Sequence, residues 1–246
     1  MRQVHKLLTL AFTVKLAIYL IIAVVGSLFR PLDASCSLIP LRFTILRPFL
    51  AWDGMHFVGI ALNGYTHEHN CAFFPLLPVL LASKSADAVI LKGLAVNLGA
   101  HLLSVWFLWQ ITVVKAPEVA FESVVFFILN GASAFHSGMY SESLFSVLFL
   151  AGVYWLLVAS SGGRWMRLSG MVCWLAAGFV RSNAVLSGIL LAADKLFLPV
   201  SWTEKAVNCL LASLCAIPFM LVQFYFWKTM HFPHFLSYSY IQSKYW

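Results

Sequence analysis

Charged residues are scarce in this sequence. Asp, Glu, Lys and Arg together make up 10% of its 246 residues, whereas hydrophobic residues make up 61%. An ordinary soluble domain has roughly 25% charged residues, and a soluble globule cannot hide so much apolar surface from water. The composition therefore excludes a soluble enzyme, a disordered chain and a nucleic-acid-binding domain. It predicts an all-α, polytopic membrane protein.

Several sequence patterns are absent as well. There is no basic run, no internal repeat, no low-complexity segment and no Asn-x-Ser/Thr sequon. Because the 16 Lys and Arg residues are scattered, the net charge of +7 is interpreted as a topology signal, although a few of them remain candidates for a lipid phosphate. The five Cys residues form no CxxC pair, so buried thiols are expected. Cys36 and Cys71 flank one loop, and a disulfide between them in an oxidising lumen is the alternative.

Apolar segments of about 20 residues, the length that crosses a bilayer, recur along the chain. The expected spans are about 7–29, 88–114, 119–135, 141–159, 168–191 and 206–227, followed by a polar tail, 228–246, in one membrane domain. Arg2, His5 and Lys6 favour a cytoplasmic N-terminus, which places the Pro-rich loop of about 30–87 on the non-cytoplasmic face. The apolar piece 72–83 contains two prolines and is interpreted as re-entrant or interfacial. Counting it as a full span inverts the topology after it and is disfavoured.

The richest polar stretch lies in this loop. Residues 49–61 fit a short amphipathic helix, with Pro48 near its start and Asn63 and Gly64 near its end. Asp53 and His56 are three residues apart and share one helix face, where a carboxylate beside an imidazole can serve as a general base. The alternative is that Asp53 only caps or anchors an interfacial helix.

Three further polar islands are candidates. The His67-Glu68-His69 run lacks the HExxH spacing, so contacts to a sugar or phosphate are favoured over a metal. In the turn 136–143, Glu142 begins an apolar segment, and a capped helix end is an equal alternative to a functional role. Arg181 lies inside an apolar segment and requires a phosphate or a buried carboxylate, for which Glu142 is one candidate.

Other polar residues in the expected spans are interpreted as structural. Asn97 and His101 are expected to be satisfied by helix packing. Lys15 and Lys92 are expected to extend along the helix surface to the membrane interface.

The order of these motifs resembles the GPI mannosyltransferase 2 family, PIG-V. The most specific part runs from Trp52 to Pro75 and comprises Trp52-Asp53-Gly-Met-His56-Phe57, Gly64-Tyr65, Glu68-His69-Asn70 and Ala72-Phe-Phe-Pro75. The later motifs are Tyr140-Ser-Glu142, Arg181-Ser-Asn183 and Tyr238-Ser-Tyr240-Ile-Gln242-Ser. Together they extend over almost the whole chain.

The resemblance implies a GT-C type glycosyltransferase of the endoplasmic reticulum membrane: a multi-pass helical bundle with a large first luminal loop that carries short interfacial helices. Such a transferase moves the second mannose, in α1,6 linkage, from dolichyl-phosphate mannose to the GPI precursor on the luminal side. A β-linked donor and an α-linked product imply inversion by one displacement. An acidic residue of the first luminal loop is the usual base; Asp53 matches it, and Glu68 is the runner-up.

The resemblance also suggests roles for the remaining polar residues. His56, His69 or Arg181 would stabilise the leaving phosphate, and the other expected substrate-binding residues are Trp52, Asn70, Tyr140, Glu142, Asn183, Tyr240 and Gln242. The reaction requires neither metal nor cofactor. The expected partners are the lipid donor, the GPI precursor and a small membrane subunit, with no nucleic acid.

Family members are usually longer, so the chain is expected to correspond to the N-terminal portion of the family architecture. The competing interpretations are a truncated relative that acts as a membrane scaffold or subunit, and a lipid or solute transporter. The absence of paired half-repeats weakens the transporter interpretation.

Overall fold

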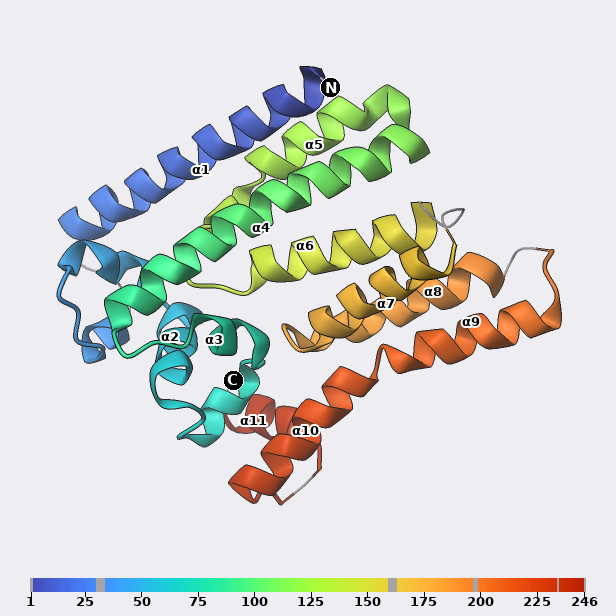
Figure 1. Ribbon diagram of the computed structural model, residues 1–246. Coiled ribbons are helices and arrows are strands. Elements are labelled where there is room, and N and C mark those ends of the chain that lie inside the picture. Colours follow the sequence, from blue (N-terminus) through green and yellow to red (C-terminus); the bar gives the residue numbers. More distant parts are fainter. Residues whose placement is uncertain (1, 30–33, 159–162, 197–198, 234, 246) are drawn as a thin grey trace. The chain divides into compact units, whose positions relative to one another are not determined.

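The computed structural model describes residues 2–29, 34–158, 163–196, 199–233 and 235–245 (Figure 1). Every regular element in these ranges is a helix, and no described residue belongs to a β-strand. The predicted all-α class is therefore confirmed. By its internal contacts the chain divides into two compact units, Met1–Thr66 with Leu77–Val147 and His67–Leu76 with Leu148–Trp246. The single membrane domain stays a prediction.

The first unit is built on three helices that lie side by side (Figure 1): α1 (Arg2–Leu28), α4 (Ala86–Lys115) and α5 (Ala120–Leu129). Short elements fill the loop between α1 and α4, namely the 3-10 helices η1 (Ala34–Leu38) and η2 (Thr44–Leu50) and the α-helices α2 (Asp53–Asn63) and α3 (Leu76–Leu81). The 3-10 helices η4 (Pro117–Val119) and η5 (Gly131–Ala134) flank α5, and α6 (Glu142–Val153) begins in this unit.

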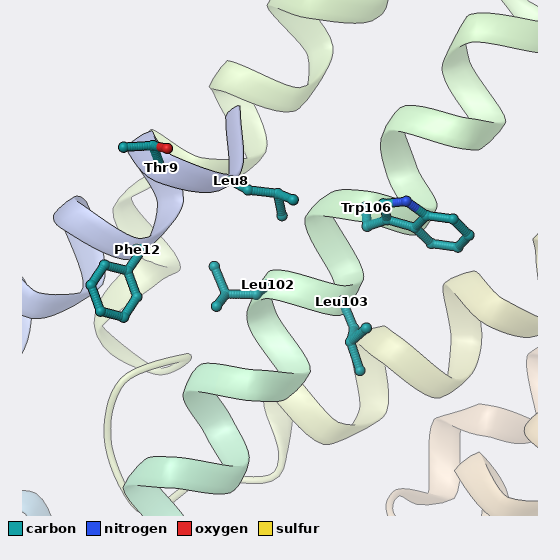
Figure 2. A pocket seen from close by; sticks show the side chains of 6 residues that line it. All are labelled: Leu8, Thr9, Phe12, Leu102, Leu103 and Trp106. Carbon is teal, nitrogen blue, oxygen red and sulfur yellow. The ribbon is translucent and has the colours of Figure 1, made fainter. Parts of the chain in front are cut away.

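An apolar groove of about 430 Å³ lies between α1 and α4 (Figure 2). Its lining residues are Leu8, Thr9, Phe12, Leu102, Leu103 and Trp106. The Thr9 hydroxyl and the Trp106 indole N–H are the polar side-chain groups of this lining, and no lining residue is an acid or a base. The groove therefore suits hydrocarbon and offers no group for proton transfer.

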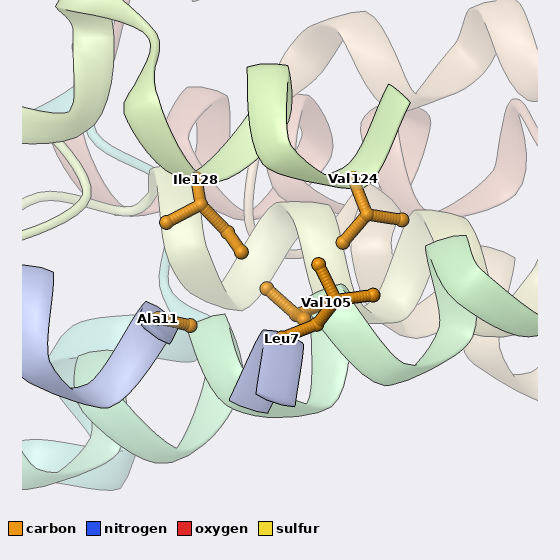
Figure 3. Close-up of a cluster of buried hydrophobic side chains, with 5 residues drawn as sticks. All are labelled: Leu7, Ala11, Val105, Val124 and Ile128. Atoms are coloured by element: carbon orange, nitrogen blue, oxygen red, sulfur yellow. The ribbon is translucent and has the colours of Figure 1, made fainter. Parts of the chain in front are cut away.

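The core of the first unit contains the buried side chains Leu7, Ala11, Val105, Val124 and Ile128 (Figure 3). The buried residues of α1 are Leu7, Ala11 and Lys15, which recur every four residues and so lie on one helix face. Lys15 thus extends the apolar stripe that faces α4 and α5. It is 0% exposed, so it does not extend along the helix surface as expected. Lys92 is exposed on α4, where its Nζ donates to the Ala82 carbonyl oxygen at 3.1 Å.

The second unit contains η3 (Glu68–Ala72), the end of α6, the π-helical turn η6 (Tyr154–Val158), α7 (Arg164–Gly178), η8 (Ser182–Leu186) and α8 (Ser187–Leu196). It continues with α9 (Trp202–Leu214), α10 (Ile217–Met230) and α11 (Ser237–Tyr245). Leu156, Met171, Trp174, Leu191 and Cys215 form its buried cluster. The Trp174 indole N–H donates to the Phe149 carbonyl oxygen at 3.0 Å, so this buried ring has its polar group satisfied.

Three expected spans differ from the helices observed. The segment 119–135 is helical as α5 only to Leu129, because Asn130 adopts an extended conformation (φ −65°, ψ 152°) before η5. The segment 168–191 is divided between α7, η8 and α8, and Arg181 at the division is also extended. The segment 206–227 is divided between α9 and α10 at Cys215 and Ala216, just before Pro218.

Three helical stretches in the described residues are long and apolar enough to cross a membrane. They are Arg2–Leu28, Ala86–Lys115 and the combined stretch Trp202–Met230. Two shorter apolar helical stretches, Glu142–Leu156 and Ser182–Ala193, lie between the last two. The topology of the chain in the membrane stays a prediction.

Candidate active site

A tight turn carries the candidate base Asp53. Trp52 has a φ of 54° and a ψ of −120°, the values of the first central residue of a type II′ turn. The Gly54 amide donates to the Ala51 carbonyl oxygen at 3.1 Å and closes this turn. Gly is the usual residue at that position, and a side chain there costs on the order of 1–3 kcal/mol. Strain of this kind concentrates at functional sites, and here it immediately precedes a carboxylate.

The backbone around Gly54 is packed too closely for a side chain. A Cβ atom at this position would lie 2.7 Å from the Phe49 carbonyl oxygen and 3.3 Å from the Met139 Cβ. The Met139 amide donates to the same Phe49 oxygen at 3.3 Å. The Trp-Asp-Gly sequence therefore lets α2 begin directly against the segment that contains Met139.

That segment is the turn between η5 and α6, which brings Tyr140 to the Asp53 turn. The Tyr140 hydroxyl donates to the Ala51 carbonyl oxygen at 2.9 Å. From α4, the buried Asn97 side chain donates to the carbonyl oxygens of Gly138 at 2.6 Å and Tyr140 at 3.2 Å. Asn97 was expected to be satisfied by helix packing; its amide nitrogen instead holds the backbone of this turn.

Electrostatics link Tyr140 to both candidate carboxylates of the first unit. Burial raises the pKa of Tyr140 to about 12, and the negative charges of Asp53 and Glu142 add to the shift. Tyr140 therefore keeps its proton at neutral pH and remains a hydrogen-bond donor. Asp53 and Glu142 are partly buried, each in the first turn of its helix. His56 is partly buried one turn after Asp53, and Trp52 is 59% exposed.

The sequence left two alternatives open: that Asp53 only caps or anchors its helix, and that Glu142 only belongs to a capped helix end. Helix α2 begins at Asp53 and its N-cap is Trp52, so Asp53 is a first-turn residue and not the capping residue. The helix ends at Asn63 and is followed by Gly64, as the punctuation predicts. Helix α6 begins at Glu142, and the Phe145 amide donates to the Ser141 carbonyl oxygen at 2.9 Å.

In the second unit, Glu68 joins η3 to α11. Its Oε2 accepts hydrogen bonds from the Lys244 Nζ at 2.8 Å and the Tyr245 hydroxyl at 3.0 Å. These hydrogen bonds lower the pKa of Glu68 and raise that of Lys244. Lys244 also donates to the Tyr240 hydroxyl at 3.1 Å. A carboxylate with a lowered pKa and two donors on one oxygen is a weak proton acceptor.

Histidines and aromatic rings surround this ion pair. The rings of His67 and His69 stack with centroids 5.3 Å apart, and His69 meets the edge of Tyr245 at 5.8 Å. Burial lowers the pKa of His69, and the nearby His67 lowers it further. The described residues contain no group of three or more His, Cys, Asp or Glu side chains that could hold a metal ion.

The remaining candidates of the second unit lie at helix ends or breaks. Arg181 is partly buried between α7 and η8, and Asn183 is exposed on η8. The Leu76 amide donates to the Phe179 carbonyl oxygen at 2.9 Å, which ties the end of the Ala72-Phe-Phe-Pro75 motif to this break. Asn70 is buried in η3, and on α11 Tyr240 is partly buried while Gln242 is exposed.

The cysteines are thiols. Cys36 and Cys71 are both buried, and neither is in a disulfide. Burial raises the pKa of Cys71 to about 12, and the negative charge of Glu68 adds to the shift. Cys71 is therefore protonated and inert at neutral pH.

Sequence reasoning missed two residues, one in each unit, that hold a neighbouring segment in place, and both are polar residues inside apolar helices. The Lys15 Nζ donates to the Ser133 carbonyl oxygen and the Ser137 hydroxyl in the turn after α5. Gln223 is fully buried in α10, and its Oε1 accepts from the Ser237 hydroxyl at 2.9 Å and the Tyr238 amide at 2.8 Å, which fixes the start of the tail helix. Intramembrane polarity was the available signal for each.

The fold and these residues define a class: an all-α membrane protein in which the acidic residues with described side chains lie in the first turns of its helices. The family model described as Mannosyltransferase (PIG-V) matches residues 2–246, and the chain belongs to this family. No solved structure matches it.

Several curated relatives are similar to this chain in sequence. The chain is 34% identical over 227 residues to GPI alpha-1,6-mannosyltransferase 2 of Cricetulus griseus, covering 82% of this chain and 45% of the relative. It is 27% identical over 242 residues to GPI mannosyltransferase 2 of Kluyveromyces lactis, covering 80% of this chain and 58% of that relative. For the protein of the same name from Eremothecium gossypii the identity is 27% over an alignment of 304 residues, covering 98% of this chain and 70% of that relative. The chain thus spans about half the length of the first two relatives.

Proposed function

We propose that this chain carries the catalytic loop of a GPI α1,6-mannosyltransferase in the endoplasmic reticulum membrane. It would transfer mannose from dolichyl-phosphate mannose to the GPI precursor at the luminal face. The observation that carries the proposal is the strained Trp52 turn, which presents Asp53 at the start of α2 in a chain of the mannosyltransferase family.

In the proposed reaction, Asp53 accepts the proton of the 6-hydroxyl of the acceptor mannose. The hydroxyl oxygen forms a bond to C1 of the donor mannose while the bond from C1 to the phosphate oxygen breaks. The electron pair of that bond leaves with dolichyl phosphate, and the β-linked donor gives an α-linked product. His56 lies one helical turn from Asp53, where a protonated imidazole would stabilise negative charge on the leaving phosphate. His69 and Arg181 are further candidates for that role.

The structure favours Asp53 over Glu68 as the base for an electrostatic reason. Lys244 and Tyr245 already donate to Glu68 and lower its pKa, so proton transfer to it is less favourable. In the first unit, Glu142 and the exposed indole of Trp52 suit sugar hydroxyls. In the second unit, the family resemblance suggests Asn70, Asn183, Tyr240 and Gln242 as candidates for such contacts. The proposed scheme uses neither a metal nor a cofactor.

The test is a microsomal assay with dolichyl-phosphate mannose and a GPI precursor that carries one mannose, in cells that lack this transfer. Asp53→Asn should reduce formation of the two-mannose product by about 10²–10⁴-fold at unchanged abundance, the range expected for loss of a general base. Glu122→Gln is the matched control, because Glu122 is also a first-turn carboxylate but is exposed on α5. It should leave the rate unchanged.

The outcomes separate the interpretations. An Asp53→Asn protein that is folded and still active would refute the assignment of the base, and a larger loss in Glu68→Gln would move it to Glu68. If the folded wild-type chain gives no two-mannose product, it is not a transferase by itself. The scaffold or subunit interpretation would then hold.

A further inference from the structure

The ammonium group of Lys15 is buried in the first unit and is bound entirely by oxygens of one distant turn. Its Nζ donates to the Ser133 carbonyl oxygen at 2.9 Å, the Ser133 hydroxyl at 3.3 Å and the Ser137 hydroxyl at 2.8 Å. An ammonium has three N–H donors, and here it has three acceptors. We propose that Lys15 is a positioning residue that fixes the turn of residues 133–140 and, through it, the Asp53 turn. The catalytic part of this inference rests on the function proposed above.

The three acceptors of Lys15 are neutral and lie more than 100 residues away in sequence. A lysine whose only task was to avoid the membrane interior would extend to the interface. An ion pair for general stability would use a carboxylate. Lys15 instead satisfies the backbone and hydroxyls of η5 and the residues after it, and the Ser137 hydroxyl in turn donates to the Ser133 carbonyl oxygen at 2.8 Å. Removing the ammonium group therefore removes the centre of this hydrogen-bond network.

The same turn also holds the backbone that precedes Asp53. Met139 donates from its amide to the Phe49 carbonyl oxygen, and Tyr140 donates from its hydroxyl to the Ala51 carbonyl oxygen. Lys15 of α1 thus holds the beginning of the turn, Asn97 of α4 holds its end, and the turn holds residues 49–51.

The position of this turn has an energetic consequence for catalysis. A charged group deep in an apolar helix is costly, and such residues are retained for specific roles. Reacting groups displaced by about 1 Å can lose on the order of 100-fold in rate. Because Lys15 acts through the turn, its removal should lower the rate of the chemical step while substrate binding is largely kept.

The test that does not depend on activity is hydrogen exchange in the full chain. Lys15→Met keeps the length of the side chain and removes the ammonium group. Lys92→Met is the matched control, since Lys92 is exposed on α4 and contacts the Ala82 carbonyl oxygen. Lys15→Met should accelerate exchange of the Met139 and Gly54 amides by about tenfold or more, and Lys92→Met should leave both unchanged. Unchanged exchange at both amides in folded Lys15→Met would overturn the proposal.

The activity measurement tests the catalytic consequence. Lys15→Met should lower kcat by about 10–100-fold with KM for the donor within about twofold, whereas a variant that only destabilises the fold lowers the amount of enzyme and leaves kcat per folded molecule unchanged. Tyr140→Phe removes the hydrogen bond to Ala51, and the double variant should be no slower than the slower single variant. Losses that multiply would show independent action and overturn the proposed route. If the wild type is inactive while exchange responds as expected, the proposed function fails and the positioning of the turn stands.

Discussion

The backbone at Trp52 provides the sharpest test of the candidate site, because two substitutions separate its conformation from its side chain. Trp52→Ala removes the indole but keeps a Cβ in the positive-φ conformation of 54°. Trp52→Gly removes the indole and the Cβ together. The indole is 59% exposed, and both variants lose its contacts equally, so their difference in stability isolates the backbone term.

The expected difference follows from two opposing effects. Relief of the disfavoured conformation contributes about 1–3 kcal/mol, and the greater freedom of Gly in the unfolded chain offsets about 0.5–1 kcal/mol of it. Trp52→Gly should therefore be about 1 kcal/mol more stable than Trp52→Ala. For a chain of this length, 1 kcal/mol corresponds to roughly 2–4 °C in Tm. Both variants should lose mannosyl transfer to the same extent if the indole binds substrate.

Thermal unfolding of the purified chain in detergent gives the comparison. His231 is the internal standard, since it is exposed, follows α10 and has a left-handed conformation with φ 53° and ψ 38°. His231→Gly should also exceed His231→Ala in Tm, without an effect on transfer. If His231→Gly has a higher Tm than His231→Ala but Trp52→Gly unfolds at or below the temperature of Trp52→Ala, the positive-φ conformation at Trp52 is not strained and the reasoning fails.

Two further predictions concern contacts within each unit. Gly54→Ala should destabilise the chain by about 1–3 kcal/mol, measured as a lower Tm, because the new Cβ would overlap the Phe49 carbonyl oxygen; an unchanged Tm would contradict the close packing. The attachment of α11 to η3 should depend on pH, because the pKa of Glu68 is lowered and that of Lys244 is raised. Glu68 stabilises this attachment above its unfolded pKa of about 4.3, and its stabilisation is lost as the pH falls through its lowered pKa in the folded chain. Lys244 stabilises the attachment below its unfolded pKa of about 10.4, and its stabilisation is lost as the pH rises through its raised pKa in the folded chain. The protection of α11 from hydrogen exchange, corrected for the intrinsic pH dependence of amide exchange, should therefore be greatest between about pH 5 and 10, and Glu68→Gln should remove the acid limb.

The sequence predicted the helix that carries Asp53 and His56, and it predicted where that helix ends. It placed the start of this helix four residues too early, at residue 49, whereas α2 begins at Asp53. The positive φ of Trp52 explains the difference. A bulky aromatic residue disfavours that conformation, and it is compensated by contacts with residues 139 and 140, which local sequence patterns do not contain.

The environment of Lys15 also could not be predicted from local sequence patterns. The apolar residues around it predicted a membrane helix, and α1 includes them all. Its environment depends on Ser133 and Ser137, which are brought to it only by the packing of α1 against α5 and by the end of α5 at Leu129. The apolar pattern around Arg181 does not predict the observed break, because a continuous helix and two shorter helices both satisfy it.

The polar contacts in the first unit matter more than their number suggests, because of the medium in which its long helices lie. Apolar side chains pack against lipid and against each other with similar energies, so they fix the position of one membrane helix against another only weakly. A hydrogen bond has direction and a defined length, and Lys15 and Asn97 each direct theirs at the backbone of one turn. That turn holds the carbonyl groups of Phe49 and Ala51. The position of Asp53 is therefore set from within the helices, by residues outside the polar loops in which sequence motifs locate the chemistry.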